Sequence, residues 1–158
     1  MIKIMFVCHG NICRSPMAEF IMKDLVAEKG LSDKFVIASS ATSSEEISGG
    51  VGNLMYPPAR AELKRRGIPF EPRRATKLSP LDYGKYDLFI GMDSANMRNM
   101  KYILSGDPQN KTRMLMSYTD TPGEVSDPWY SDRFDIAFDD IMSGCQGLLE
   151  SLLKQGKV

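Results

Sequence analysis

Short apolar runs and segments with helical spacing alternate along the chain. The runs are short enough to be buried strands, and each is followed by a segment whose apolar residues recur every three or four positions. The predicted strands cover residues 3–7, 35–39, 86–92 and 113–116. Strands that alternate with helices are typical of a parallel sheet covered by helices on both faces, so the pattern predicts an α/β fold.

The helical segments carry recognisable start and stop signals. Ser15 is predicted as an N-cap with Pro16 at the first helical position, and Gly30 ends that helix after residue 29. Further helices are predicted at residues 59–66, after the cap Asp93 to about residue 104, and from about Arg133 to the C-terminus. The last helix has an apolar stripe formed by Phe134, Phe138, Ile141, Cys145, Leu148 and Leu152. Residues 42–58 and 119–132 are predicted to be loops.

Composition narrows the function classes. With 158 residues, 42% of them hydrophobic, the chain is expected to form one domain over residues 1–158. Twenty basic residues balance twenty acidic ones, so bulk charge gives no support for a nucleic-acid partner. No apolar segment approaches the roughly 18 residues of a membrane span, so we expect no membrane insertion and a cytoplasmic location. The three cysteines are expected to be thiols. Nothing in the composition indicates an oligomeric state.

The segment VCHGNICRSP, residues 7–16, connects the first predicted strand to the first predicted helix. In parallel sheets, ligands bind where the carboxyl ends of strands meet helix N-termini, and such an N-terminus favours anions. Gly10 and Asn11 tolerate the left-handed conformations that turn successive N–H groups inward. Arg14 adds a planar donor for an oxyanion. The loop is therefore predicted to bind a phosphate-like group, and it lacks the glycine spacing of nucleotide-binding loops.

Cys8 follows the strand and is expected to point into this anion site. A cysteine at a helix N-terminus and close to an arginine is favoured as a thiolate nucleophile. Ser15 could donate its hydroxyl to that thiolate. The alternative is that Cys8 is a small buried apolar residue.

A thiolate that attacks a phosphate ester needs a proton donor for the leaving group. Asp127, followed by Pro128, Trp129 and Tyr130 in a polar loop, is the candidate acid. The alternative is an ordinary Asp-Pro turn.

These residues carry a family resemblance. The run Cys8-His9-Gly10-Asn11-Ile12-Cys13-Arg14-Ser15, together with Asp127-Pro128-Trp129-Tyr130, closely resembles the low molecular weight protein tyrosine phosphatases. The resemblance covers essentially the whole chain and includes the turn Gly91-Met92-Asp93-x-x-Asn96. It implies a four-stranded parallel sheet, a phosphocysteine intermediate on Cys8, phosphoryl binding by Arg14, and Asp127 as the acid that later activates water. It also implies that no metal and no cofactor are needed.

The same resemblance implies how substrate is bound. The loop residues His9, Gly10, Asn11, Ile12, Cys13 and Ser15 would surround the phosphoryl group, and the expected substrates are proteins that contain phosphotyrosine. Tyr56, Trp129 and Tyr130 are candidate walls for the aryl ring, although aromatic residues are more often packing. The apolar Ile12 favours an aryl ester, since related phosphoarginine enzymes tend to have threonine there. Separately from the resemblance, Cys13 lies five residues after Cys8 in the same curled loop, so the two sulfurs could form a disulfide under oxidation; the alternative is that Cys13 is a small residue facing the core.

Two departures from the family pattern stand out. Glu45-Glu46-Ile47-Ser48-Gly49-Gly50 replaces a loop that often carries an aromatic residue, and no histidine occurs near residues 71–74 to brace the phosphate loop. The bracing group is therefore not predicted. Cys8, His9 and Cys13 lack a fourth ligand for a metal site. A thiol-dependent arsenate reductase on the same fold, or a non-hydrolytic phosphoprotein-binding module, remains an alternative function.

Overall fold

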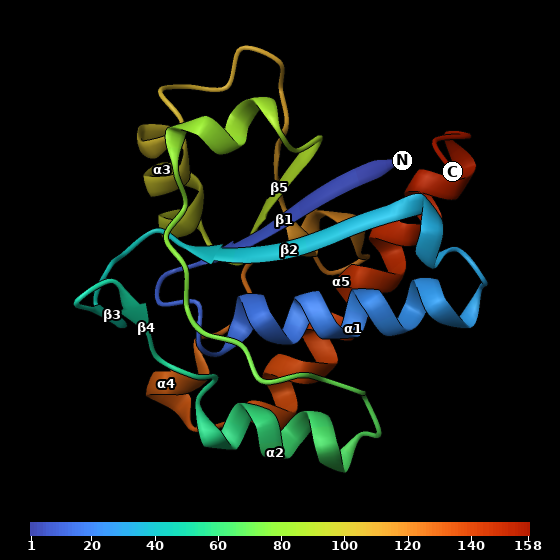
Figure 1. The fold of residues 1–158 in the computed structure, drawn as a ribbon. Helices are drawn as coiled ribbons and strands as arrows, with labels where there is room; N and C mark the ends of the chain where they lie inside the picture. The colour runs from blue at the N-terminus through green and yellow to red at the C-terminus, as the bar shows by residue number, and fades with distance from the viewer.

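The computed structural model describes all residues 1–158, and its centre is a four-stranded sheet (Figure 1). The strands are β1 Ile2–Cys8, β2 Phe35–Ala41, β5 Leu88–Gly91 and β6 Thr112–Met114. Their order is β2-β1-β5-β6, and all three neighbouring pairs are parallel. The predicted fold class, a parallel sheet with helices on both faces, is confirmed.

Alternate residues of β1 supply two separate cores, one on each face of the sheet. Ile4 and Phe6 pack in the larger cluster with α1 Arg14–Glu28 and α5 Phe134–Lys154, and α2 Pro57–Arg65 completes that layer. Met5 and Val7 pack on the opposite face against residues of α3 Ser94–Ile103. Because β1 is buried on both faces, it reads as a continuous apolar run rather than an alternating one. None of the helices combines the length and apolar character needed to cross a bilayer.

Three local predictions were wrong. Residues 42–58 contain a small antiparallel hairpin, β3 Ile47–Ser48 with β4 Val51–Gly52, whose turn residues Gly49 and Gly50 have φ of 57° and 78°. Residues 119–132 contain a short helix, α4 Pro128–Ser131. Helix α1 begins at Arg14 with Cys13 as its N-cap residue, because the Ser15 hydroxyl contacts Cys8 and Asn11 instead of capping.

Other boundaries agree closely with prediction. Asp93 caps α3 through a reciprocal pair of hydrogen bonds with Asn96, and Arg133 precedes α5. All six residues of the predicted α5 stripe are buried. Three short 3-10 helices, Ser32–Lys34, Pro80–Gly84 and Leu115–Tyr118, complete the elements.

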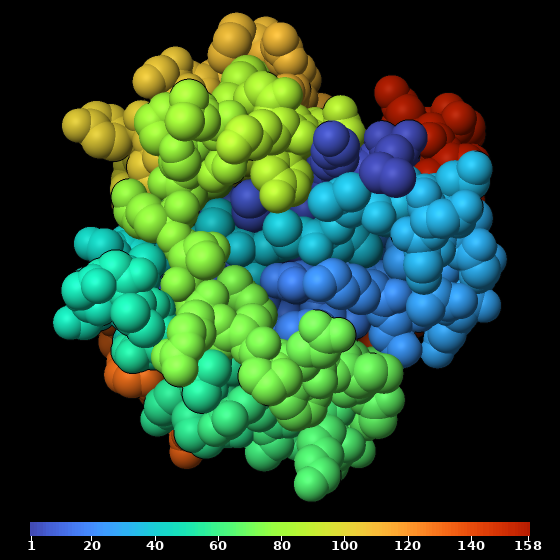
Figure 2. Space-filling view, viewed as in Figure 1, coloured from blue at the N-terminus to red at the C-terminus, as the bar shows by residue number.

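The segment between α2 and β5 crosses the front of the molecule in the view of Figure 2, where it is green. Its backbone pairs with the end of β2, since Ala41 N donates to Thr76 O at 2.7 Å and Leu78 N donates to Ala41 O at 2.8 Å. This pairing brings residues 73–76 beside the loop that follows β1.

Candidate active site

A cavity of about 330 Å³ opens at the carboxyl end of β1. Its lining comes from three separate parts of the chain: the loop after β1, the segment before β3, and the start of α4. The lining residues are Cys8, His9, Gly10, Asn11, Ile12, Cys13, Arg14, Glu45, Glu46, Asp127, Trp129 and Tyr130. The structure thus brings the three predicted catalytic residues, Cys8, Arg14 and Asp127, to one cavity.

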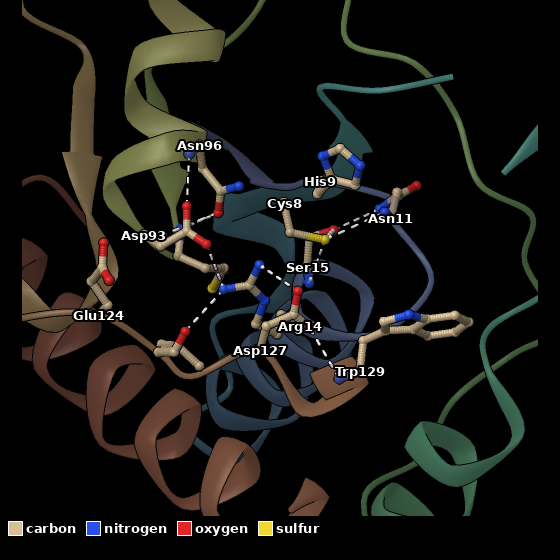
Figure 3. A network of polar contacts seen from close by, with 12 residues as sticks. Cys8, His9, Asn11, Arg14, Ser15, Asp93, Asn96, Glu124, Asp127 and Trp129 are labelled. Atoms are coloured by element: carbon tan, nitrogen blue, oxygen red, sulfur yellow. Dashed lines mark hydrogen bonds and ion pairs between the residues drawn. The ribbon is translucent and has the colours of Figure 1, made fainter. Parts of the chain in front are cut away.

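The Cys8 sulfur lies at the centre of converging hydrogen-bond donors (Figure 3). Asn11 N is 3.3 Å from Cys8 Sγ, Ser15 N is 3.4 Å away, and Ser15 Oγ is 2.9 Å away. Cys8 is 3% exposed, so these protein groups take the place of bulk water around the sulfur. Hydrogen bonds that point at the sulfur favour its charged form, which is the form that acts as a nucleophile.

The loop conformation depends on Asn11. Its φ is 60°, the left-handed region that asparagine tolerates better than most residues. Gly10, which was expected to share this conformation, is not among the residues with positive φ. Instead, a Cβ at Gly10 would lie 3.2 Å from Glu46 Cγ, so the missing side chain gives room at the cavity wall.

Arg14 is buried below the loop and held by the loop before α4. Its Nη1 donates to Asp93 Oδ2 at 2.9 Å and to Val125 O at 2.9 Å. Burial by itself lowers the pKa of Arg14, but the negative charges of Cys8, Asp127 and Asp93 more than offset it and raise that pKa. The guanidinium is therefore a fixed positive charge at the cavity. Asp93 was predicted only as a helix cap, and the structure adds this contact with Arg14.

Asp127 lies at the start of α4, far from β1 in sequence but close to Arg14 in space. Its Oδ1 accepts a hydrogen bond from Trp129 N at 3.0 Å, and its Oδ2 lies 3.6 Å from Arg14 Nη2. The side chain is 30% exposed. Asp127 is thus both the N-cap of α4 and a carboxyl group that opens into the cavity.

The bracing group that the sequence left open is Arg73. Arg73 Nη2 donates to Asn11 Oδ1 at 2.8 Å, and Thr76 N donates to the same oxygen at 3.0 Å. Asn11 Nδ2 in turn donates to Ser15 Oγ at 2.8 Å and to Ser39 Oγ at 3.0 Å. Sequence reasoning missed this network because it joins three distant segments and no motif marks Arg73.

The cavity rim is aromatic on one side and acidic on the other. Trp129 is 54% exposed and Tyr130 is 86% exposed. Tyr56, also expected as a wall, does not line the cavity; it packs behind Trp129 with ring centroids 4.9 Å apart. Across the cavity, His9 Nε2 lies 3.0 Å from Glu45 Oε2, and Asn53 Nδ2 donates to Glu46 Oε2 at 2.6 Å.

All three cysteines are free thiols. Cys13 is buried beside Cys8, and burial, together with the charges of Cys8 and Asp127, raises its pKa to about 12. Cys145 is fully buried on α5, where burial raises its pKa, and its Sγ lies 3.8 Å from Ala18 O in α1. Only Cys8 combines access to the cavity with donors directed at its sulfur.

Comparison with known proteins agrees with this geometry. The family model described as low molecular weight phosphotyrosine protein phosphatase matches residues 3–158. The low molecular weight protein-tyrosine-phosphatase YfkJ of Bacillus subtilis is 34% identical over 98% of both chains, and its crystal structure gives a TM-score of 0.88 with 98% of this chain and 96% of that chain covered. The crystal structure of the Streptococcus pyogenes low molecular weight protein tyrosine phosphatase is 36% identical, with a TM-score of 0.85 and coverage of 96% and 93%.

A eukaryotic relative is equally similar. The low molecular weight phosphotyrosine protein phosphatase of Schizosaccharomyces pombe is 35% identical over 96% of this chain and 97% of its own length. Because the family model and these relatives match nearly the whole chain, this chain belongs to the low molecular weight protein tyrosine phosphatases and is a hydrolase of that family.

Proposed function

We propose that this protein hydrolyses phosphotyrosine esters in proteins through a phosphocysteine intermediate on Cys8. The observation that carries the proposal is the position of the Cys8 sulfur, which receives the donors of Asn11 and Ser15 in a cavity that also contains Arg14 and Asp127. The loop residues 9–13 and Ser15 would surround the phosphoryl group.

In the first step, the Cys8 thiolate attacks phosphorus and a new S–P bond forms. The P–O bond to the tyrosine breaks, and Asp127 gives its proton to the departing phenoxide. Arg14 offers the phosphoryl oxygens a planar charged donor, while Asp93 and Val125 O hold its other end in place.

In the second step, Asp127 is a carboxylate and takes a proton from a water molecule that attacks phosphorus. The S–P bond breaks, inorganic phosphate leaves, and the Cys8 sulfur departs as a thiolate. Ser15 Oγ, 2.9 Å from the sulfur, stabilises that leaving group by donating a hydrogen bond. No further reactant is consumed, so the cycle returns the enzyme to its starting form.

The depth and rim of the cavity favour an aryl ester. Cys8 is 3% exposed and therefore lies at the bottom, while Trp129 and Tyr130 stand exposed at the rim beside Ile12. A long flat phosphotyrosine can span that depth with its ring between apolar groups, whereas a short phosphoserine side chain brings the peptide backbone into contact with the rim.

Hydrolysis of phosphotyrosine, phosphoserine and phosphoarginine peptides, in buffer with a metal chelator, tests the proposal. We expect turnover of phosphotyrosine, competitive inhibition by vanadate, and no turnover by Cys8→Ser. Acid-quenched enzyme should carry a phosphoryl group on Cys8. Wild-type activity in Cys8→Ser, or an equal kcat/KM on phosphoserine and phosphotyrosine peptides, would refute the proposal.

The two alternatives predict different results. Arsenate reduction through a relay of thiols needs further cysteines near the cavity, but Cys145 lies fully buried against Ala18. A module that binds phosphoproteins without hydrolysis does not require Asp127. An assay with aryl phosphate and one with arsenate and a thiol reductant therefore separate the three functions.

A further inference from the structure

Arg73 is the one charged side chain from outside the phosphate loop that contacts the left-handed residue Asn11. Its Nη2 donates to Asn11 Oδ1 at 2.8 Å and its Nη1 donates to Asn11 O at 3.3 Å. The Arg73 side chain is 15% exposed, and its Nε lies 3.6 Å from Glu19 Oε1 on α1. The sequence gives no indication of these contacts, because Arg73 belongs to an irregular segment between α2 and β5.

The donors around Asn11 determine which way its amide points. Arg73 and the backbone N–H of Thr76 can only donate, so the atom that faces both must be the amide oxygen. The amide nitrogen then faces Ser15 Oγ at 2.8 Å. Since the Ser15 oxygen already accepts this hydrogen bond, its own hydroxyl hydrogen is available for the Cys8 sulfur 2.9 Å away.

The second hydrogen bond of the Asn11 amide nitrogen also runs from donor to acceptor, toward Ser39 and then Glu19. Asn11 Nδ2 donates to Ser39 Oγ at 3.0 Å, and Ser39 Oγ donates to Glu19 Oε1 at 2.6 Å. Lys23 Nζ, 2.7 Å from Glu19 Oε2, donates to the second oxygen of that carboxylate. Glu19 therefore accepts the hydrogen bond of Ser39 and offsets the charge of Arg73, and no donor in the network faces another donor.

We propose that Arg73 is a positioning residue for the nucleophile: by fixing the orientation of the Asn11 amide, it makes Ser15 donate its hydroxyl hydrogen to the Cys8 thiolate. The inference rests on the proposed role of Cys8 as the nucleophile. Without Arg73, the amide of Asn11 loses the partner that fixes its orientation together with Thr76 N. If the amide then turns over, its oxygen faces Ser15 Oγ, so Ser15 donates its hydrogen to Asn11 and the sulfur loses a hydrogen bond that favours its charged form.

Other charged and titratable groups lie around the Cys8 sulfur and have to be kept constant in a test. They come from its own loop, from the rim and from the loop before α4, and they comprise Arg14, Cys13, His9, Glu45, Glu46 and Asp127. Arg73 also acts through space: burial lowers the pKa of Arg73, while the charges of Glu19 and Cys8 raise it. A test must therefore distinguish the hydrogen-bond route through Asn11 and Ser15 from plain attraction between charges.

The rate of alkylation of Cys8 by iodoacetamide, measured from pH 4 to 9 with the full chain, reports the fraction of thiolate without requiring turnover. Arg73→Met removes all donors at similar length, and we expect the half-reactive pH to rise by about 0.5 to 1 unit, the size of one typical net hydrogen bond. Arg74→Met is the matched control, because Arg74 is an exposed neighbour that donates only to Gly52 O at 3.0 Å. It should leave the curve unchanged.

Comparing the effect of Arg73→Met in the wild type and in Ser15→Ala distinguishes the hydrogen-bond route from attraction between charges. If Arg73 acts through Asn11 and Ser15, adding Arg73→Met to Ser15→Ala should move the half-reactive pH by no more than about 0.2 units, since the route is already interrupted. Two fully additive shifts would overturn the proposal and leave attraction between charges. An equal shift in Arg73→Met and Arg74→Met would overturn it as well.

Arg73→Lys covers the case in which Arg73→Met does not fold. Lysine keeps the charge near Glu19 but has no planar group to contact Glu19 and both Asn11 oxygens, so we expect a smaller upward shift that is also lost in the Ser15→Ala background. A wild-type alkylation curve in Arg73→Lys would refute the positioning role. Failure of the protein to hydrolyse phosphotyrosine would refute the proposed function alone, because the alkylation readout does not depend on it.

Discussion

Replacing Asp127 with asparagine separates the role of Asp127 as a proton donor from its role as the N-cap of α4. Asp127 Oδ1 caps α4 by accepting from Trp129 N at 3.0 Å, and asparagine is an equally good N-cap. The loop and the position of Trp129 should therefore be retained. What asparagine lacks is an acidic proton for the leaving group, and Arg14 loses a partner that is 3.6 Å away.

The size of the effect follows from the role of the acid. General acid catalysis contributes about 10² to 10⁴ in rate, which is at least about 2.7 kcal/mol of the activation barrier. We expect kcat/KM for phenyl phosphate, whose leaving group resembles tyrosine, to fall by about 10²-fold or more in Asp127→Asn. An acidic nitrophenol departs without help, so its aryl phosphate should lose less than about 10-fold.

The assay is a series of aryl phosphates that differ only in the acidity of the phenol. A plot of log kcat/KM against leaving-group acidity should be nearly flat for the wild type and steep for Asp127→Asn. Asp120→Asn, an exposed carboxyl change before the same short helix, is the control and should follow the wild type. Parallel plots for wild type and Asp127→Asn would show that Asp127 is not the acid.

Three further predictions concern other charged groups. Arg14→Lys should lose activity almost as fully as Arg14→Ala, since one ammonium cannot hold both Asp93 and two phosphoryl oxygens; near wild-type kcat/KM would contradict this. Glu45→Gln and Glu46→Gln should lower kcat/KM a few-fold (about 2- to 5-fold) for phosphotyrosine peptides with flanking lysines at low salt, and an effect that persists in 1 M salt would point to another cause. Burial of the Asp107 carboxyl raises its pKa, but hydrogen bonds from Tyr83 and Thr112 outweigh burial and hold that pKa well below its usual range. The ionised carboxylate should therefore stabilise the fold fully above about pH 4 and less below it, so the urea midpoints of wild type and Asp107→Asn should converge in acid.

Local signals in the sequence were sufficient for most of the sheet and for the phosphate loop. Strands β1 and β5 contain continuous apolar runs, and Asp93 has a cap signature three residues before Asn96. The hairpin at residues 47–52 escaped prediction because strands of two residues are too short to show alternation. Ser15 has the sequence of a helix cap, but tertiary hydrogen bonds to Cys8 and Asn11 take its hydroxyl instead.

The part of the site that the sequence could not predict is the part built from distant segments. Arg73 contacts Asn11 only because the segment after α2 pairs with the end of β2, and neither residue type nor spacing indicates that pairing. Tyr56 shows the reverse error: an aromatic residue was assigned to the cavity wall, but it packs behind Trp129. Sequence patterns predict local secondary structure, whereas these contacts depend on how segments distant in sequence pack against each other.

The last prediction is a redox response of the same loop. Peroxide should oxidise Cys8 rather than Cys13, because Cys13 has a pKa of about 12 and stays a thiol. The Cys8 thiolate becomes a sulfenic acid, and hydroxide is the other product. The Cys13 sulfur can then attack that of Cys8, which forms a disulfide and releases water. The charge of Cys8, one cause of the raised pKa of Cys13, is lost on oxidation, but burial, the larger cause, remains.

Because burial keeps Cys13 a protonated thiol even after Cys8 is oxidised, closure of the disulfide should be slow relative to the first oxidation. At low peroxide the wild type should lose two hydrogens and all activity, and a thiol reductant should restore both. The fraction that cannot be restored should grow with peroxide concentration, because a second oxidation of Cys8 competes with slow closure. After the same peroxide dose, Cys13→Ser, which should be active, should be over-oxidised at Cys8 and fail to recover, because no thiol captures its sulfenic acid, while Cys145→Ser should recover like the wild type. Equal recovery of wild type and Cys13→Ser would leave Cys13 with a packing role, since the buried thiol would then not reach Cys8 before peroxide does.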